Sequence, residues 1–179
     1  MLLILFIDYI IYYMENKILN KTSLTGRKVL YANLLKNKFI TWMYVILTVI
    51  FLGLAAYQLA VNTANSPQFV VHITFAFVSL VFAFVIPAFS AFSWRSRAKK
   101  NYGTTNMDVE YQFNDISLRL IYDGKVIDKF DYHDIYKTIK KKDLFLIVGS
   151  SKLFIIDING FNKANALEKV EGYIKRFTK

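Results

Sequence analysis

The sequence predicts a membrane protein of the α+β class, with a two-helix transmembrane hairpin followed by a small antiparallel, barrel-like β-sheet that a C-terminal helix caps. Three observations support this class. Residues 39–94 contain no Asp, Glu, Lys or Arg, residues from 107 onward alternate apolar and polar side chains, and residues after 160 return to helical spacing. The predicted parts are an N-terminal segment (1–38), the hairpin (39–94) and a C-terminal domain (101–179).

The N-terminal segment combines an apolar start with a basic end. Of its first fourteen residues thirteen are apolar, the exception being Asp8. This stretch is too short to span a bilayer and lacks the basic start and cleavage site of a signal peptide. An interfacial helix, a strand of the C-terminal sheet and a misplaced start codon remain open, and packing on the C-terminal domain is favoured. Residues 20–38 are expected to form a linker and then an amphipathic basic helix that leads into the first span.

Two apolar runs, Phe39–Val61 and Phe69–Phe92, form the predicted hairpin. A helix rises 1.5 Å per residue, so each run reaches roughly 35 Å, enough for a hydrocarbon core of about 30 Å. The polar stretch NTANSPQ between them is long enough only for a tight reversal. Two buried helices of a soluble core are the alternative, but the rest of the chain is too short to cover them.

The charges around the hairpin predict its orientation. The formal net charge is +10, and most of the excess flanks the uncharged block, whereas the connecting loop has no charge. The positive-inside rule then places both termini in the cytoplasm of a multi-pass protein of the inner membrane. Cations and tryptophans at these ends are expected to contact lipid headgroups. These membrane-anchoring residues are Lys36, Lys38, Trp42, Trp94, Arg95, Arg97, Lys99 and Lys100.

Two residues inside the second run have alternative interpretations. His72 is an ionisable residue that could serve as a proton site, but its place three residues into the run favours the outer interface, where a neutral histidine is tolerated. Pro87 is expected to kink the helix. The runs contain no acidic residue, lysine or arginine, so a transport pathway would require an oligomer.

The C-terminal domain is predicted to contain about six strands in a meander and one amphipathic helix. Asp123-Gly124 is a favoured type I′ hairpin turn, and further turns are expected at 141–143 and 149–151. Asn162 is the expected N-cap of the helix, and Glu171 and Lys175 are spaced for an ion pair on it. The expected core positions of this helix are Ala164, Leu167, Val170, Ile174 and Phe177.

The order of these elements, and the run KVIDKFDYHDIYKTIKKKDLFLIVGSSKLFIIDINGF, resemble the YcxB-like family of bacterial membrane proteins. The resemblance implies two membrane helices and a C-terminal domain like a pleckstrin-homology (PH) barrel. The chain departs from the family pattern in two places: Tyr132–Ile135 lacks the usual tryptophan, and Asp157 stands where a proline is usual. The resemblance therefore bears on fold and topology.

Several kinds of chemistry are excluded or disfavoured. The chain has no cysteine, its glycines are scattered singly, and its C-terminal domain is nearly neutral, so thiol catalysis, a phosphate loop, nucleic-acid binding and a cofactor are not expected. His133 lies between Asp131 and Asp134, where a solvated turn is favoured over a metal site. Lys140, Lys141 and Lys142 could contact an anionic ligand, although an exposed charged turn that protects a sheet edge is favoured.

Three functions are weighed on these features. The favoured one is a non-enzymatic membrane protein whose cytoplasmic domain binds a protein, peptide or lipid partner in a regulatory or scaffolding role. The alternative is an immunity or accessory protein whose hairpin pairs with another membrane protein or toxin through small residues. The third, an enzyme at the membrane surface, is least favoured. The small residues are Gly53, Ala55, Ala56 and Ala60, which an ordinary contact between the two spans would also use.

Overall fold

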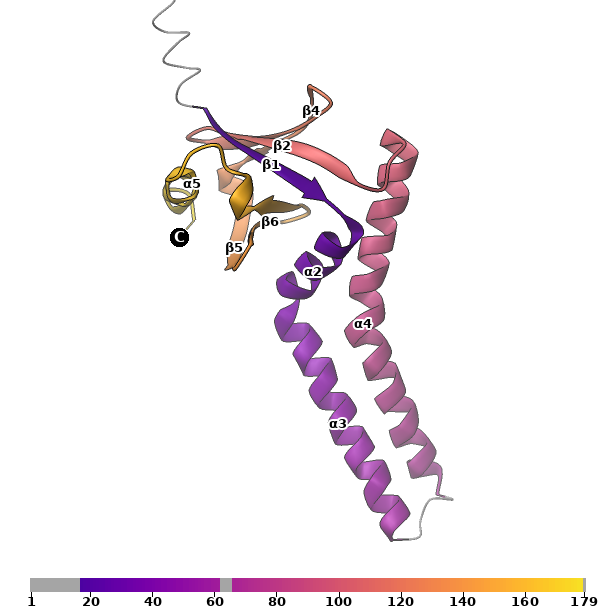
Figure 1. The fold of residues 1–179 in the computed structure, drawn as a ribbon. Coiled ribbons are helices and arrows are strands. Elements are labelled where there is room, and N and C mark those ends of the chain that lie inside the picture. Colours follow the sequence, from indigo (N-terminus) through magenta and orange to yellow (C-terminus); the bar gives the residue numbers. More distant parts are fainter. Residues whose placement is uncertain (1–16, 62–65, 179) are drawn as a thin grey trace, which may run out of the picture. The chain divides into compact units, whose positions relative to one another are not determined.

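The computed structural model describes residues 17–61 and 66–178, which form two compact units (Figure 1). A helical unit comprises Gly26–Thr105, and a β-rich unit combines the chain before it, up to Thr25, with the chain after it, from Asn106. The apolar stretch of residues 1–14 lies outside the described residues. The β-rich unit therefore contains residues from both sides of the hairpin, and not only the predicted 101–179.

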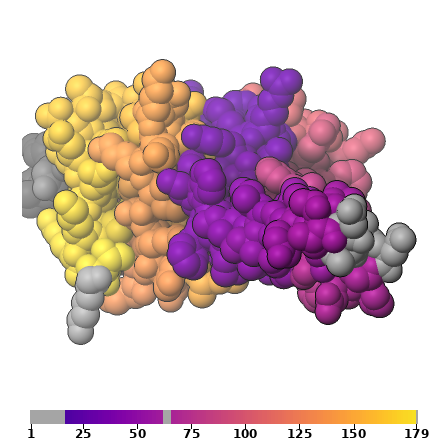
Figure 2. Space-filling view, turned by 90° about the horizontal axis from the view of Figure 1, so that it is seen from below, coloured from indigo at the N-terminus to yellow at the C-terminus, as the bar shows by residue number. Residues whose placement is uncertain are grey.

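The helical unit contains α2 (Gly26–Lys36), α3 (Lys38–Ala60) and α4 (Pro67–Tyr102). By length and composition, α3 and α4 could cross a membrane. They pack against each other in antiparallel fashion, with Tyr44 stacked on Phe82 and Phe51 on Phe75 at ring-centroid distances of 5.5 and 5.3 Å. The two long apolar helices are confirmed. Figure 2 shows this unit from a second side.

The contact between α3 and α4 is made largely by small and polar side chains. On α4 the buried residues recur every three or four positions, whereas large side chains such as Phe77 and Phe89 are 66% and 69% exposed. In the most apolar 18-residue stretches of α3 and α4, only 11% and 17% are buried, whereas the core helix of a soluble protein is mostly buried. Small residues inside and large apolar residues outside are typical of helices packed in lipid. The buried set is Thr48, Ala55, Gln58, Ala76, Ser79, Ala83, Pro87 and Ala91.

The second apolar helix, α4, ends later than predicted. Instead of stopping near Phe92, α4 continues through Pro87 without interruption to Tyr102. Gly103 then ends the helix in the left-handed conformation at φ 72°, which glycine adopts without a Cβ clash.

The β-rich unit contains two antiparallel sheets, ordered β1-β2-β3-β4 and β5-β6-β7. The expected closed, barrel-like sheet is not found, because no ladder joins β4 to β5 and the chain between them forms a 3-10 turn, η1 (Tyr132–Asp134). The six strands expected after residue 106 and their turns are confirmed. The strands are β1 (Ile18–Leu24), β2 (Met107–Phe113), β3 (Ser117–Tyr122), β4 (Lys125–Asp131), β5 (Ile135–Lys141), β6 (Leu144–Gly149) and β7 (Leu153–Asp157).

Strand β1 corrects the predicted linker at residues 20–25. It pairs with β2 along its whole length, from Ile18 opposite Phe113 to Leu24 opposite Met107. Two of its four buried residues, Asn20 and Thr22, are polar, so its alternation is hidden in the hydropathy pattern. The hairpin is thus inserted between two neighbouring strands of one sheet.

Polar side chains of β1 connect the two sheets. The Asn20 amide nitrogen donates to the carbonyl oxygen of Asp157 at 2.7 Å, and the Thr22 hydroxyl accepts from the Asp157 backbone N–H at 2.8 Å. The Thr22 hydroxyl also donates to the Asn20 Oδ1 at 2.7 Å. Both side chains are almost fully buried, so the bonds satisfy groups that would otherwise lose water without compensation.

Close backbone approach accompanies this connection. A Cβ atom on Gly160, in the 3-10 turn η2 (Ile158–Gly160), would clash with the carbonyl oxygen of Lys21. Aromatic packing completes the core between the sheets: Phe154 of β7 contacts Phe130 at 5.0 Å and Tyr111 at 6.3 Å, measured between ring centroids.

The C-terminal helix α5 (Ala166–Lys175) begins later than predicted. Asn162 is not its N-cap, because its side-chain oxygen accepts the backbone N–H of Leu19 at 3.2 Å, and Asn165 occupies the cap position. The expected core positions Val170 and Ile174 are buried, whereas Ala164 is exposed. Glu171 pairs with Lys140 on β5 at 3.0 Å rather than with Lys175, so it links the helix to the sheet.

Candidate functional site

The basic residues predicted to anchor the protein lie on continuous helix. Arg95, Arg97, Lys99 and Lys100 occupy the last turns of α4 and are exposed, and Trp94 is half-buried beside them. At 1.5 Å per residue, Lys100 lies about 9 Å beyond Trp94 along the helix axis. The cations therefore form a helical extension of the apolar segment and not a loop.

The helix α2 packs alongside α4 within the helical unit. Its Gly26 lies so close to Arg95 that a Cβ there would be 2.8 Å from the Arg95 Cδ, so the aliphatic part of this arginine covers the start of α2. Lys36 ends α2, Lys38 begins α3, and the nearby Trp42 is 56% exposed. Residues 26–105 carry eight cations and no acidic residue, which favours contact with an anionic surface.

The lysine cluster Lys140–Lys142 is only partly available to a ligand. Lys140 is paired with Glu171 at 3.0 Å, whereas Lys141 at the end of β5 and Lys142 in the following turn are exposed. One of the three predicted anion contacts is thus neutralised by α5.

Each histidine contacts another side chain of the chain. The His133 ring packs edge-on against Phe177 at 4.4 Å, and Asp131 pairs with Lys129 at 3.7 Å. Among residues 17–61 and 66–178, no three His, Cys, Asp or Glu side chains are grouped so as to hold a metal ion. His72 Nδ1 lies 3.1 Å from Gln58 Oε1, a hydrogen bond between α4 and α3 that sequence reasoning missed.

A hollow of about 580 Å³ lies beside β2, β3, β4 and α5, within the β-rich unit. We call it the β2–β3 hollow. Its basic lining residues are Lys17, Arg119 and Lys129, its acidic one is Asp115, and Tyr173 of α5 contributes an aromatic ring. The remaining lining residues are Gln112, Phe113, Asn114, Ile116 and Ser117. This volume lies in the range of about 300–1,000 Å³ typical of ligand sites.

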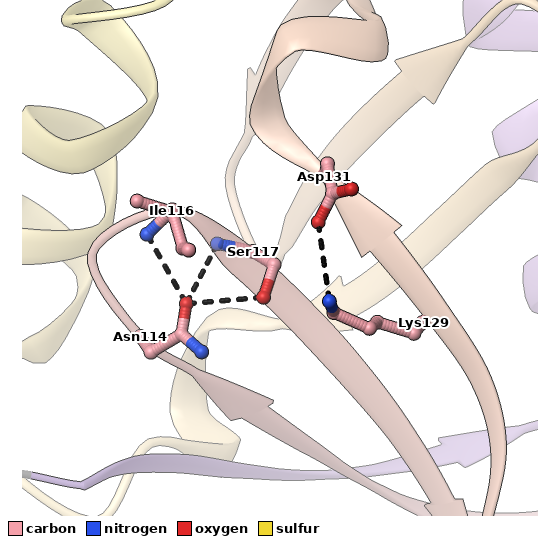
Figure 3. A network of polar contacts seen from close by, with 5 residues as sticks. All are labelled: Asn114, Ile116, Ser117, Lys129 and Asp131. Carbon is pink, nitrogen blue, oxygen red and sulfur yellow. Dashed lines mark hydrogen bonds and ion pairs between the residues drawn. The ribbon is translucent and has the colours of Figure 1, made fainter.

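The loop between β2 and β3 is held rigidly at this hollow. The side-chain oxygen of Asn114 accepts three hydrogen bonds, from the backbone N–H groups of Ile116 and Ser117 and from the Ser117 hydroxyl, at 3.1, 2.6 and 3.1 Å (Figure 3). The Tyr132 hydroxyl donates to the Asn114 carbonyl oxygen at 2.9 Å. These hydrogen bonds fix the conformation of the loop without a ligand.

A second hollow of about 490 Å³ lies toward the other end of the same sheet. Lys21 lines it together with Asp108, Glu110 and Asp123, so its charges are mixed with an acidic excess. Sequence reasoning missed both hollows, because their residues meet only through the pairing of β1, β2 and β3.

No family model matches this chain, and no curated protein matches it. The resemblance to the YcxB-like family stays a prediction from the order of elements.

Proposed function

We propose that this chain is a multi-pass protein of the inner membrane whose cytoplasmic β-rich unit binds a protein or peptide partner, as a regulator or scaffold and not as an enzyme. The observation that carries the proposal is the insertion of two apolar, outward-facing helices between the paired strands β1 and β2. Because β1 and β2 share one sheet, a hairpin between them must leave and return on the same side of a bilayer.

The charge distribution supports the cytoplasmic side. All eight cations of residues 26–105 lie on α2, at the start of α3 or at the end of α4, and the residues near the reversal between the spans are uncharged. By the positive-inside rule the β-rich unit then lies in the cytoplasm, and the cations contact the anionic leaflet at about 1 kcal/mol each.

The topology is tested by thiol labelling, since the chain has no cysteine. Single cysteines replace Gln68, which is exposed at the reversal, and Ser150, which is exposed between β6 and β7. Gln68 is preferred to Ser66, whose hydroxyl accepts the N–H of Phe69 at 3.4 Å. A membrane-impermeant maleimide on intact cells should label the Gln68 site only. Labelling of the Ser150 site would contradict a cytoplasmic β-rich unit.

The hairpin remains the alternative partner-binding element. Ala55 is buried against α4, whereas Gly53, Ala56 and Ala60 are exposed on α3, so the contact between the spans leaves these three small residues uncovered. Photo-crosslinking amino acids at exposed positions of either unit separate the two functions in living cells. Adducts of defined mass from Thr138 or Lys142 support the β-rich unit, and adducts only from Gly53 or Ala56 support the hairpin.

A further inference from the structure

We propose that the β2–β3 hollow is a binding site for an acidic peptide segment, with a carboxylate held between Arg119 and Lys129. This inference rests on the proposed function, because it assigns the partner's chemistry and its place on the β-rich unit.

The strand register around Arg119 is unusual. With a two-residue turn at Asp123-Gly124, an unbroken hairpin would place Asp128 opposite Arg119 and neutralise it. The register instead shifts between Leu120 and Ile121, so that Arg119 stands opposite Lys129. Like charges directly opposite each other on neighbouring strands are destabilising.

Asp128, which the register shift moves away from Arg119, forms an ion pair with another residue. Asp128 pairs with Lys152 at 2.6 Å, and the Lys152 ammonium also lies 5.9 Å from the centre of the Phe130 ring. Within the described residues the side chain of Arg119 has no hydrogen bond or ion pair, although the residue is half-buried. Lys129 has only Asp131, at 3.7 Å, with both side chains 56% exposed. An anion between the two cations would offset their repulsion.

The hydrogen-bond donors around these cations also suit a carboxylate. Asn114 uses its side-chain oxygen within the loop, and its amide nitrogen has no partner among the described residues. The Arg119 guanidinium presents paired N–H donors that match the two oxygens of a carboxylate. The hollow thus offers donors where an acidic ligand needs them.

The other residues of the hollow favour a peptide over a phosphate. Asp115 lines the same hollow and would repel a dianion more strongly than a single carboxylate. Ile116, which also lines it, is 53% exposed, and Tyr173 adds a ring, so apolar side chains next to the acidic one would be covered. An extended segment with acidic and apolar residues fits these features.

The test uses the full-length protein in nanodiscs of neutral lipid. The probe is a blocked, fluorescent hexapeptide in which glutamate and leucine alternate, and its matched control carries glutamine for each glutamate. We expect saturable binding of the glutamate peptide and at least about tenfold weaker binding of the control, as for loss of a charge-assisted hydrogen bond. Equal binding of the two peptides, or none, overturns the proposal.

Two double variants locate the site. Arg119→Gln with Lys129→Gln should weaken binding at least about tenfold, whereas Lys141→Gln with Lys142→Gln removes the same charge from exposed positions and should change it less than about twofold. Equal effects overturn the site. If the first variant unfolds, as hydrogen exchange of β2–β4 would show, Lys129→Gln alone is compared with Lys141→Gln under the same criterion.

Competition separates the other anions. The competitors are inorganic phosphate, vesicles of anionic phospholipid and the unlabelled glutamate peptide. If phosphate or the vesicles displace the fluorescent peptide at a lower concentration than the unlabelled peptide does, the ligand is that anion and the peptide assignment is wrong. Failure of the proposed function gives a different result: Ser150 is labelled from outside the cell, while the peptide titration is unaffected. Crosslinks from Lys142 but not from Ile116, which lines the hollow, would keep the function and overturn this site.

Discussion

Gly160, in the turn η2, lies in close contact with the backbone of β1. Its missing side chain lets the turn η2 pass over the backbone of β1, where Asn20 is bonded to Asp157 and to Thr22. These contacts connect the strand before the hairpin to the strands after it. They use hydrogen bonds and backbone approach rather than an apolar side chain.

Gly160→Ala should destabilise the β-rich unit by roughly 1–3 kcal/mol, because its Cβ would clash with the Lys21 carbonyl oxygen, which is backbone and cannot rotate away. Gly172→Ala, within α5, is the matched control. Its Cβ would meet nothing within 4 Å, so helix propensity should stabilise the unit by up to about 1 kcal/mol. Urea-dependent hydrogen exchange of β1 and β2 measures both. Effects of the same sign would contradict this account.

Two buried tyrosines should make the β-rich unit sensitive to alkali. Burial raises the pKa of the Tyr111 hydroxyl, and burial, with the nearby Tyr173 and Asp115, raises that of Tyr132. Above the unfolded-state pKa of about 10, the unfolded chain loses these protons while the folded chain keeps them. The unfolded state then binds fewer protons, and the free energy of unfolding falls as pH rises.

Absorbance at 295 nm, with unfolding followed at each pH, tests this expectation. Tyr111→Phe and Tyr132→Phe should each make the loss of stability above pH about 10 less steep. Tyr136→Phe is the control, since Tyr136 is 77% exposed, and should leave the steepness unchanged. An unchanged slope in both buried variants would show that these hydroxyls are not protected from ionisation.

At the scale of elements, the hairpin and the β-rich unit have opposite side-chain arrangements. Small residues such as Ala83 fill the contact between α3 and α4, and phenylalanines face outward. In the β-rich unit, large side chains such as Tyr111, Phe145 and Ile156 are buried, and every residue of β6 is buried. The outer face of the hairpin is thus of the kind that suits lipid, and that of the β-rich unit is of the kind that suits water.

Ala83→Leu should separate α3 and α4, because a leucine cannot fit at a position that is 1% exposed, at a cost of roughly 1–3 kcal/mol. Cysteines at Tyr44 and Phe82, whose rings stack at 5.5 Å, report the separation through the yield of a short bismaleimide crosslink. Ala88→Leu adds the same volume at an exposed position and should not lower the yield. A similar loss in both variants would contradict the proposed packing.

At the scale of the molecule, the β-rich unit depends on chain from both sides of the hairpin. Without β1, strand β2 becomes an edge, and Asp157 loses its bonds to Asn20 and Thr22. A fragment of residues 102–179 lacks β1 and should not fold.

Joining residues 17–24 to 107–179 through an Asn-Gly turn should restore folding, because Leu24 and Met107 are paired at adjacent ends of β1 and β2. Dispersed amide resonances are expected for the joined chain and collapsed ones for the fragment. A dispersed spectrum of the fragment alone would show that β1 is dispensable.

Features set by neighbouring residues could be predicted from sequence. Hydropathy identified α3 and α4, and Asp123-Gly124 identified its hairpin turn, where both residues have positive φ, 50° and 70°. These signals are strong because the burial of a long apolar run and the conformation of a two-residue turn depend on a few adjacent side chains. The exposed lysines 140–142 were equally visible, but their ion pair with α5 was not.

Features set by distant residues required the folded chain. Strand β1 can be recognised only from its pairing with β2, because two of its inward-facing residues, Asn20 and Thr22, are polar. They can be buried only because Asp157 supplies their hydrogen-bond partners. Arg119 stands opposite Lys129 because the register shifts by one residue, whereas the turn predicts Asp128 at that position. Backbone pairing is nearly the same in either register, so packing and ion pairs such as Asp128–Lys152 select between them, and these form only when the sheets come together.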